Sequence, residues 1–310
     1  MKTLRNRKPY PTKITIDVHT ACNATCTICP YPKLSREVIS HGIMEWDLFE
    51  KVVRDFQETC RRHRFVGTIS FCNMSEPTIL RNFLDYLKYV YDRKFDVYFN
   101  TNVSYLTPAF IDRLISEKLF CGIHLNILSL TKEKYEKIMG LKFEPTMVNL
   151  NYLASHYPTR FLNVGIEKTL MTREELQEAR VFFKNLGIKA YEYVSRDRAQ
   201  NLLDQTTPVT DISYGCLADR PIHRMMVAYN GRVYLCDEDM AQEVVFGDLK
   251  TQTIQEVWNG PELQKILEVI YGQRKGEENF LCYRCVHAKK TPNFEWGSFW
   301  KKRIRGDIEP

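Results

Sequence analysis

The fold of this chain is decided by one short stretch, CNATCTIC, at residues 22–29. An alternating apolar and polar run at residues 14–19 predicts a β-strand, which places the stretch on the loop after that strand. Cys22, Cys26 and Cys29 are separated by three and two residues, so one loop supplies three thiolates for three corners of a [4Fe–4S] cluster. No fourth cysteine lies nearby, which leaves the fourth iron open to a small ligand. The alternatives are a zinc site that lacks one ligand and buried cysteines that only pack.

The composition is that of an ordinary globular protein of 310 residues, with 44% hydrophobic residues and a net charge of +6. There is no apolar run of the ~18 residues that cross a bilayer. The basic segment 1–11 is not followed by the apolar region of a secretory signal. Ten cysteines without an export signal argue against a disulfide framework. We therefore expect a cytoplasmic protein with no membrane contact.

The C-terminal tail is the one strongly basic segment. Four cations follow three aromatic residues there: Lys301, Lys302, Arg303 and Arg305 after Trp296, Phe299 and Trp300. Such a tail could contact nucleic acid or an acidic partner, but packed aromatics with solvated charges are the commoner arrangement. We therefore expect no nucleic-acid partner.

Up to about residue 200, apolar strand patterns alternate with helical patterns. The strands are expected at 14–19, 68–72, 95–99, 120–128, 162–170 and 188–194. The helices are expected at 44–56, 80–91, 108–116 (capped by Thr107), 131–138, 147–156 and 173–186, with a loop at 31–42. This alternation favours a parallel sheet with right-handed crossovers. Six units are too few for an eight-unit barrel, so we expect an open, partial (β/α)6 TIM-like barrel whose strand C-termini build the active site.

A second group of cysteines lies beyond a polar linker near residues 201–211. Strands at 225–229 and 233–236 are joined by Asn-Gly, a strong hairpin signal, and helices are expected at 253–258 and 261–271. The group comprises Cys216, Cys236, Cys282 and Cys285. Four thiolates form a closed ligand set for either a structural zinc ion or an iron–sulfur cluster.

The CxxxCxxC spacing resembles the signature of the radical S-adenosylmethionine (radical SAM) enzymes. The segments NGRVYLC at 230–236, GDL at 247–249 and EVW at 256–258 resemble the SPASM/Twitch extension of that superfamily. The resemblance implies a radical SAM core at 1–202, a small α+β Fe–S domain at 203–288 and a tail at 289–310. It also implies a SAM-binding [4Fe–4S] cluster, one auxiliary [4Fe–4S] cluster, SAM itself, and a flavodoxin- or ferredoxin-type electron donor.

The same resemblance suggests SAM-contacting residues at the strand ends. Glu76 lies in FCNMSEP at 71–77, the position of the family's GGEP-type motif, and could equally be a helix N-terminal acid. Asn126 falls where the family places a residue near the ribose, and Glu167 lies on the inner face of the fifth strand. Arg198, in RDRAQN at 196–201, aligns with the arginine of an RAGN-like segment.

Two residues are candidates for the chemistry on substrate. Cys72, at the end of the second strand, is a possible hydrogen donor, although small buried cysteines in strands are commonly inert. His124 shares a strand face with Asn126, although a lone strand histidine is more often a hydrogen-bonded core residue.

The substrate is left open by the family resemblance. The first cysteine lies at position 22, so there is no room before it for the leader-binding domain of many peptide-modifying relatives. This favours hydrogen abstraction from a small, carbohydrate-like molecule, ending in oxidation or epimerisation. The alternatives are a maturase of a ribosomal peptide or protein and, in a different class, a non-catalytic zinc or nucleic-acid binding protein.

Overall fold

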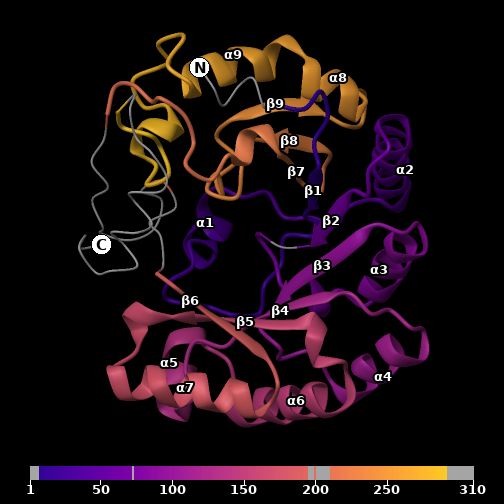
Figure 1. Ribbon diagram of the computed structural model, residues 1–310, viewed down its shortest axis with the longest axis vertical. Coiled ribbons are helices and arrows are strands. Elements are labelled where there is room, and N and C mark those ends of the chain that lie inside the picture. The colour runs from indigo at the N-terminus through magenta and orange to yellow at the C-terminus, as the bar shows by residue number, and fades with distance from the viewer. Residues whose placement is uncertain (1–6, 72, 195–198, 200–209, 292–310) are drawn as a thin grey trace.

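The computed structural model describes residues 7–71, 73–194, 199 and 210–291. One nine-stranded sheet runs through the molecule in the order β6-β5-β4-β3-β2-β1-β7-β8-β9. This sheet curves like an open letter C, with α2, α3 and α4 on its convex side and α1 on its concave side (Figure 1). In the described part of the chain no helix has the length and apolar character needed to cross a membrane.

The first six strands are parallel and pair in sequence order. They are β1 Lys13–Ile16, β2 Thr68–Phe71, β3 Asp96–Thr101, β4 Gly122–Asn126, β5 Leu162–Glu167 and β6 Lys189–Tyr193. Each expected strand is present, so the partial (β/α)6 barrel is confirmed. Its active-site end is the edge where these strands terminate.

The helices cover the outside of this barrel. They are α2 Trp46–His63, α3 Phe83–Asp92, α4 Pro108–Ser116, α5 Lys132–Met139, α6 Phe143–His156 and α7 Arg173–Asn185. The helix expected at 108–116 has these bounds, and Thr107 caps it by accepting a 3.3 Å hydrogen bond from the backbone N–H of Phe110. Helix α2 is longer than expected; it ends at His63 and is followed by the C-cap residue Arg64, which has a left-handed backbone.

The segment expected to be a loop at 31–42 was assigned wrongly in part, because it contains the helix α1 (Tyr31–Glu37). The proline in its first turn is compatible with a helix start. The buried side chains of Tyr31 and Leu34 pack against Met74 and Met240. The contact with Met240 is more than 200 positions away along the chain, so tertiary packing and not local pattern stabilises this helix.

The strand expected at 162–170 was also too long. It ends at Glu167, and the 3₁₀ turn η4 (Lys168–Leu170) follows. The Glu167 carboxylate accepts hydrogen bonds from the backbone N–H and the hydroxyl of Thr169, at 2.9 and 2.7 Å. These bonds cap the turn and stop the strand.

The C-terminal third adds three strands to the same sheet. β7 (Arg224–Val227) pairs in parallel with β1, and β8 (Arg232–Tyr234) and β9 (Val245–Asp248) follow antiparallel. The hairpin was expected and β9 was not. β9 is short and contains Gly247, where a Cβ would lie 2.5 Å from Val257 of α8 (Ile254–Asn259). Glycine therefore lets α8 pack closely on β9, and α9 (Pro261–Ile270) follows.

Side chains on the barrel strands alternate between two environments. Outward-facing residues are apolar and pack under the helices in a core that includes Phe49, Phe56, Phe71, Phe83 and Phe99. Inward-facing residues are polar: Thr15 of β1 forms a 2.8 Å hydrogen bond with Ser70 of β2, and Asn100 of β3 lies opposite His124 of β4. The inside of the barrel is therefore a polar chamber.

Candidate active site

The loop that carries the first three cysteines is held in place by backbone hydrogen bonds. The N–H groups of Thr25 and Thr27 donate to the carbonyls of Met139 and Ile138 at the end of α5, both at 2.9 Å. Cys29 N–H donates to the Cys26 carbonyl at 3.0 Å, which turns the loop back on itself. The loop conformation is thus set by the barrel scaffold.

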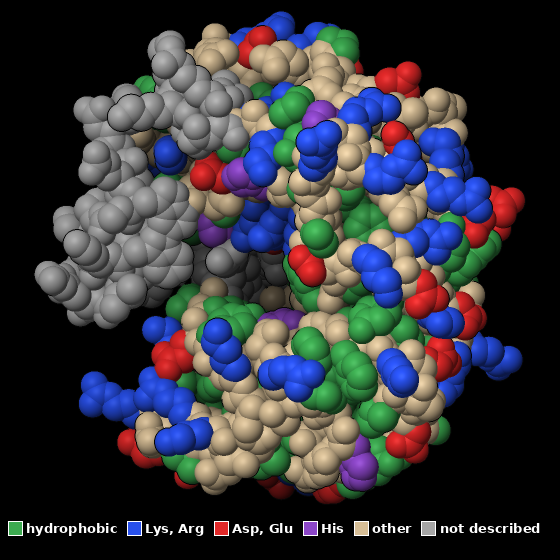
Figure 2. Space-filling view, turned by 45° about the vertical axis from the view of Figure 1, so that its right-hand side comes forward, with side chains coloured by type: hydrophobic (Ala, Val, Ile, Leu, Met, Phe, Trp, Pro, Cys, Tyr) green, Lys and Arg blue, Asp and Glu red, His purple; other side chains and the backbone are tan. Residues whose placement is uncertain are grey.

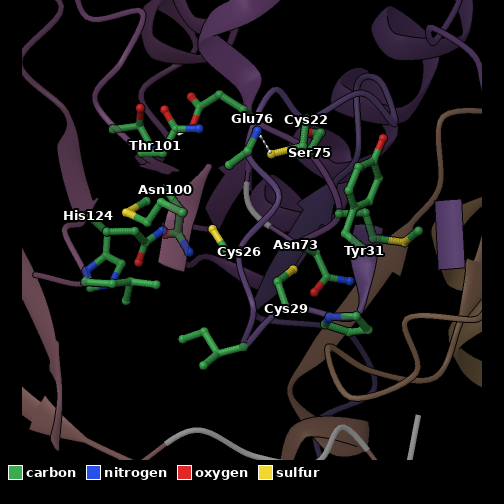
Figure 3. Close-up of a pocket in the computed structure, with 18 of the residues that line it drawn as sticks. Cys22, Cys26, Cys29, Tyr31, Asn73, Ser75, Glu76, Asn100, Thr101 and His124 are labelled. Carbon is green, nitrogen blue, oxygen red and sulfur yellow. Dashed lines mark hydrogen bonds between the residues drawn. The ribbon is translucent and has the colours of Figure 1, made fainter. Parts of the chain in front are cut away.

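The three thiols lie together in one cavity of about 390 Å³ at the C-terminal ends of the strands. In Figure 3 the sulfur atoms of Cys26 and Cys29 lie in the middle of this cavity, with His124 on one side and Tyr31 on the other. Burial, with smaller contributions from the nearby Glu76 and Cys29, raises the pKa of Cys22 to about 12. The thiolate forms therefore need a bound cation, and coordination to iron supplies one.

Glu76 lies at the wall of this cavity and is 3% exposed. Its Oε1 accepts hydrogen bonds from the backbone N–H and the hydroxyl of Thr78, at 3.2 and 2.6 Å. Its Oε2 accepts from the backbone N–H of Asn102 at 2.6 Å. Burial raises the pKa of Glu76, and these hydrogen bonds oppose the rise. The carboxylate caps the 3₁₀ turn η2 (Pro77–Ile79), as one sequence interpretation suggested, and joins the ends of β2 and β3.

His124 and Asn126 project from β4 into the same cavity. The His124 ring is hydrogen bonded on both nitrogens, to the Asn163 amide oxygen and, at 2.8 Å, to the Tyr191 hydroxyl. It also stacks on the Tyr191 ring with centroids 5.3 Å apart. Burial lowers the pKa of His124, so the ring is neutral near pH 7. His124 is therefore a hydrogen-bonded strand residue, which was the alternative interpretation from the sequence. It also forms part of the cavity wall.

A second cavity, of about 530 Å³, adjoins the first. The two share wall residues, namely Asn73, Asn100, His124 and Tyr191. The second cavity is also lined by Lys13, Thr15, Tyr98, Asn163, Arg224, Met226 and Asp237. Polar side chains from five parallel barrel strands therefore surround it.

The structure brings the second group of cysteines together. Cys216, Cys236, Cys282 and Cys285 line one small cavity, although they come from three separate points in the chain. A bridge between residues Cys216 and Ala288 and a 2.7 Å hydrogen bond from Leu217 N–H to the His287 carbonyl bring the two ends together. No three His, Cys, Asp or Glu side chains within the described ranges are arranged to hold a single metal ion. Four thiols around one cavity form a closed ligand set, which suits an iron–sulfur cluster or a zinc ion.

A buried ion-pair network borders this group. Arg220 in the turn η5 (Arg220–Ile222) is 7% exposed and contacts Asp237 through Nε at 2.9 Å and Glu238 through Nη1 at 2.8 Å. His287 Nε2 lies 3.3 Å from the same Glu238 carboxylate. Glu238 and Asp239 are fully buried, so the acidic run after Cys236 is not a solvated turn. Asp237 also lines the second cavity, which places the two sites side by side.

Three of the predicted site residues are not among the described residues that line the two adjoining cavities. Glu167 is fully buried and lines neither of the two cavities as described. Cys72 and Arg198 lie outside the described residues. The SAM contacts of Glu76, Asn126, Glu167 and Arg198 and the roles of Cys72 and His124 in chemistry remain predictions.

Several cavity residues were missed from the sequence. Asn73, Asn100, Tyr191, Lys13 and Arg224 all line one or both cavities. Four of them lie on strands at positions facing the chamber, so a polar residue at every second strand position was the available signal. Gly165 of β5 leaves room for Tyr193, which lines the first cavity, because a Cβ at position 165 would lie 2.8 Å from the Tyr193 ring.

Comparison with known families agrees with this geometry. The family model for the radical SAM superfamily matches residues 16–179, which is more than half of the chain. The chain belongs to the radical SAM superfamily. The model for the SPASM iron–sulfur cluster-binding domain matches residues 216–286. The enzyme class, the SAM-binding [4Fe–4S] cluster, SAM and an auxiliary Fe–S site are therefore established for this protein.

Two curated relatives are similar over most of their length. One is an S-adenosyl-L-methionine-dependent 2-deoxy-scyllo-inosamine dehydrogenase of Niallia circulans, 22% identical over 88% of this chain and 91% of the relative. The other is a cofactor-modifying protein for the tungsten-containing aldehyde ferredoxin oxidoreductase of Pyrococcus furiosus, 24% identical over 93% of this chain and 78% of the relative.

Solved structures share the fold. BtrN in complex with AdoMet and 2-DOIA superposes with a TM-score of 0.61 at 18% identity, covering 91% of this chain and 96% of that one. Streptococcus suis SuiB bound to precursor peptide SuiA gives 0.67 at 14% identity, covering 96% and 74%. Native anSMEcpe with bound AdoMet gives 0.64 at 15% identity, covering 95% of both chains. These neighbours include enzymes with a small-molecule ligand and enzymes with peptide ligands.

Proposed function

We propose that this enzyme abstracts a hydrogen atom from a small, carbohydrate-like molecule. The observation that carries the proposal is the second cavity, which lies between the first cysteine site and the auxiliary site. Its shared wall with the first cavity includes Asn73 and Asn100, and its opposite wall includes Asp237, next to Cys236. Amide, hydroxyl and phenol groups from the strands supply the alternating donors and acceptors that sugar hydroxyls need.

The chain's own residues bind and orient the reactants. Cys22, Cys26 and Cys29 would hold the SAM-binding cluster, and the polar wall that includes Glu76 and Asn126 would bind SAM beside it. When bound, the cluster and SAM supply a 5′-deoxyadenosyl radical, which removes one hydrogen atom from the substrate. A substrate in the second cavity would be held and oriented by the polar strand side chains that line it.

Oxidation is favoured over epimerisation by the position of the auxiliary site. Converting a secondary alcohol to a ketone removes a hydrogen atom, a proton and one further electron. An electron acceptor held by the second cysteine group would lie beside the cavity that holds the substrate, because Asp237 lines that cavity and is paired with Arg220, which lines the cysteine cavity. The similarity to a dehydrogenase of an aminocyclitol supports the same outcome. Epimerisation needs a second hydrogen donor, for which Cys72 is the candidate.

The alternative is a maturase that modifies a peptide or protein, as structural neighbours bound to peptides suggest. The cavity volume of about 530 Å³ favours a small ligand, since it lies within the usual range of roughly 300–1,000 Å³ for small-molecule sites. A peptide would need to place one side chain in this cavity and the rest of its backbone outside it.

The test is anaerobic reconstitution with iron and sulfide, followed by SAM and a flavodoxin- or ferredoxin-type reductant. Polyols, amino sugars and aminocyclitols would be supplied in deuterated water, with 5′-deoxyadenosine as the readout of radical formation. A ketone product supports oxidation, and deuterium at an inverted carbon supports epimerisation. Turnover confined to peptide substrates would overturn the small-molecule proposal. Cys26→Ala is the negative control, because it removes one of the three cluster thiolates.

A further inference from the structure

Two cations lie side by side on the wall of the second cavity. Lys13 of β1 and Arg224 of β7 are register partners on adjacent parallel strands, so their side chains leave the sheet on the same face. Both line the second cavity. The Lys13 ammonium lies 4.3 Å from the centroid of the Tyr98 ring, which lines the same cavity. Figure 2 shows a hollow in the molecular surface with Lys or Arg and His side chains around it.

This pairing of like charges needs an explanation. Like charges directly opposite each other on neighbouring strands repel, and an anion bound between them would reduce the repulsion. Among the described residues that line the cavity, the one carboxylate is Asp237. Asp237 lies 2.9 Å from Arg220 and 3.7 Å from Arg224. The described part of this wall therefore presents two cations, Lys13 and Arg224, and one carboxylate.

The two cationic side chains are also accessible to a ligand in the cavity. The Arg224 side chain is 37% exposed, so its guanidinium retains donors facing the open cavity. A planar guanidinium binds carboxylate or phosphate oxygens with two parallel hydrogen bonds, and an adjacent ammonium adds a point charge. The polar groups of Tyr98 and Asn163 line the same cavity and can bind further oxygen atoms.

We propose that Lys13 and Arg224 form an anion subsite in the second cavity and that the substrate carries a phosphate or carboxylate group bound there. The proposal rests on the proposed function, because it defines the substrate class of the same site. The neutral face of the substrate, which bears the hydrogen to be abstracted, would then lie toward Asn73, Asn100 and the first cavity. Binding of the anionic group by Lys13 and Arg224 would thus orient the substrate in the cavity.

The experiment measures binding of small anions to the reconstituted holoenzyme by calorimetric titration. Inorganic phosphate is the phosphate probe and acetate is the carboxylate probe, at constant ionic strength set with chloride. The variants are Lys13→Gln and Arg224→Gln, with the charge-conserving Lys13→Arg and Arg224→Lys. Arg232→Gln is the matched control, since Arg232 is an exposed cation on the neighbouring strand β8. Iron content and melting temperature report whether each variant is folded.

We expect at least one probe to bind wild type and Arg232→Gln equally. Its dissociation constant should rise about tenfold or more in Lys13→Gln and Arg224→Gln, and remain within about threefold in the charge-conserving variants. The tighter of the two probes identifies the anion. Failure of both probes to bind wild type would overturn the inference. So would folded Lys13→Gln and Arg224→Gln variants that bind the probe as tightly as wild type does.

A failed inference can be told apart from a failed function. Formation of 5′-deoxyadenosine with a neutral polyol, without measurable anion binding, would overturn the anion subsite and leave hydrogen abstraction intact. Anion binding that depends on Lys13 and Arg224, together with turnover of peptides alone, would overturn the small-molecule function and leave the subsite intact.

Discussion

Tyr234 donates a 2.6 Å hydrogen bond from its hydroxyl to the Oδ2 atom of Asp17. Both side chains are buried, and the bond joins β8 of the C-terminal hairpin to the end of β1. The Tyr234 oxygen also accepts a 2.9 Å hydrogen bond from Asn73 Nδ2. The amide nitrogen of Asn73 can only donate, so the Tyr234 oxygen accepts from Asn73 and its hydroxyl hydrogen is left for Asp17. The remaining carbonyl oxygen of Asn73 is thereby available to the two cavities that it lines.

Tyr234→Phe should destabilise the protein by about 1–3 kcal/mol, because it removes the hydroxyl that donates to the buried Asp17 carboxylate and accepts from the Asn73 amide, leaving Asp17 with its backbone hydrogen bond from Met74. The check is thermal unfolding of the anaerobic holoenzyme, with Tyr105→Phe as the control at an exposed tyrosine. Equal melting temperatures for the two variants would show that the Asp17–Tyr234 bond contributes little.

Asp17 should make stability depend on pH. Burial raises the pKa of Asp17 to about 7 from 3.8, although the hydrogen bond from Tyr234 opposes the rise. Between these two values the folded state holds a proton that the unfolded state releases, so stability falls as pH increases through this window and levels off above it. One such group contributes a slope of at most about 1.4 kcal/mol per pH unit.

The measurement is the difference in melting temperature between Asp17→Asn and wild type from pH 5 to pH 8. We expect this difference to shift in favour of the variant as pH rises. In Tyr234→Phe the transition should move to higher pH, since a bond that favours the charged carboxylate is gone. A difference that stays constant over the whole range would contradict the raised pKa of Asp17.

Each cysteine group should hold its own iron. Cys26→Ala and Cys236→Ala should each lose about four of about eight irons per chain, because each removes a thiolate from a different cluster. Iron and sulfide analysis after anaerobic reconstitution tests this. Cys60→Ala is the control, since Cys60 is buried in the apolar core against Phe56 and outside both groups. Loss of all the iron in either variant would mean that the two groups are not independent.

Arg220→Met should be one of the most destabilising single changes in the C-terminal third. It leaves Asp237 and the fully buried Glu238 without the guanidinium that neutralises them, at a cost of about 3–5 kcal/mol. Arg113→Met, which breaks an exposed pair with Glu117 on α4, should cost under about 1 kcal/mol. Chemical unfolding of both variants gives the comparison, and similar costs would argue against a structural role for the buried network.

Local pattern was enough for features whose evidence lies within a few residues. The helix at α4 has its expected bounds because Thr107 and Pro108 are start signals that act on neighbouring backbone groups. The helix α1 was missed because its buried residues pack on Met74 and Met240, and strand β9 because it depends on pairing with β8 and on the fit of Val257 over Gly247. Such contacts leave no periodic trace in the sequence.

The sequence by itself determined the class of chemistry, because the spacing of Cys22, Cys26 and Cys29 and the alternation of strands and helices are local properties of the chain. Only the tertiary structure decided what surrounds that chemistry. The register that sets Lys13 beside Arg224, the gathering of Cys216 with Cys282, and the bond from Tyr234 to Asp17 all join residues far apart in the chain. Their proximity depends on how strands pair and pack, and residue order alone does not specify it.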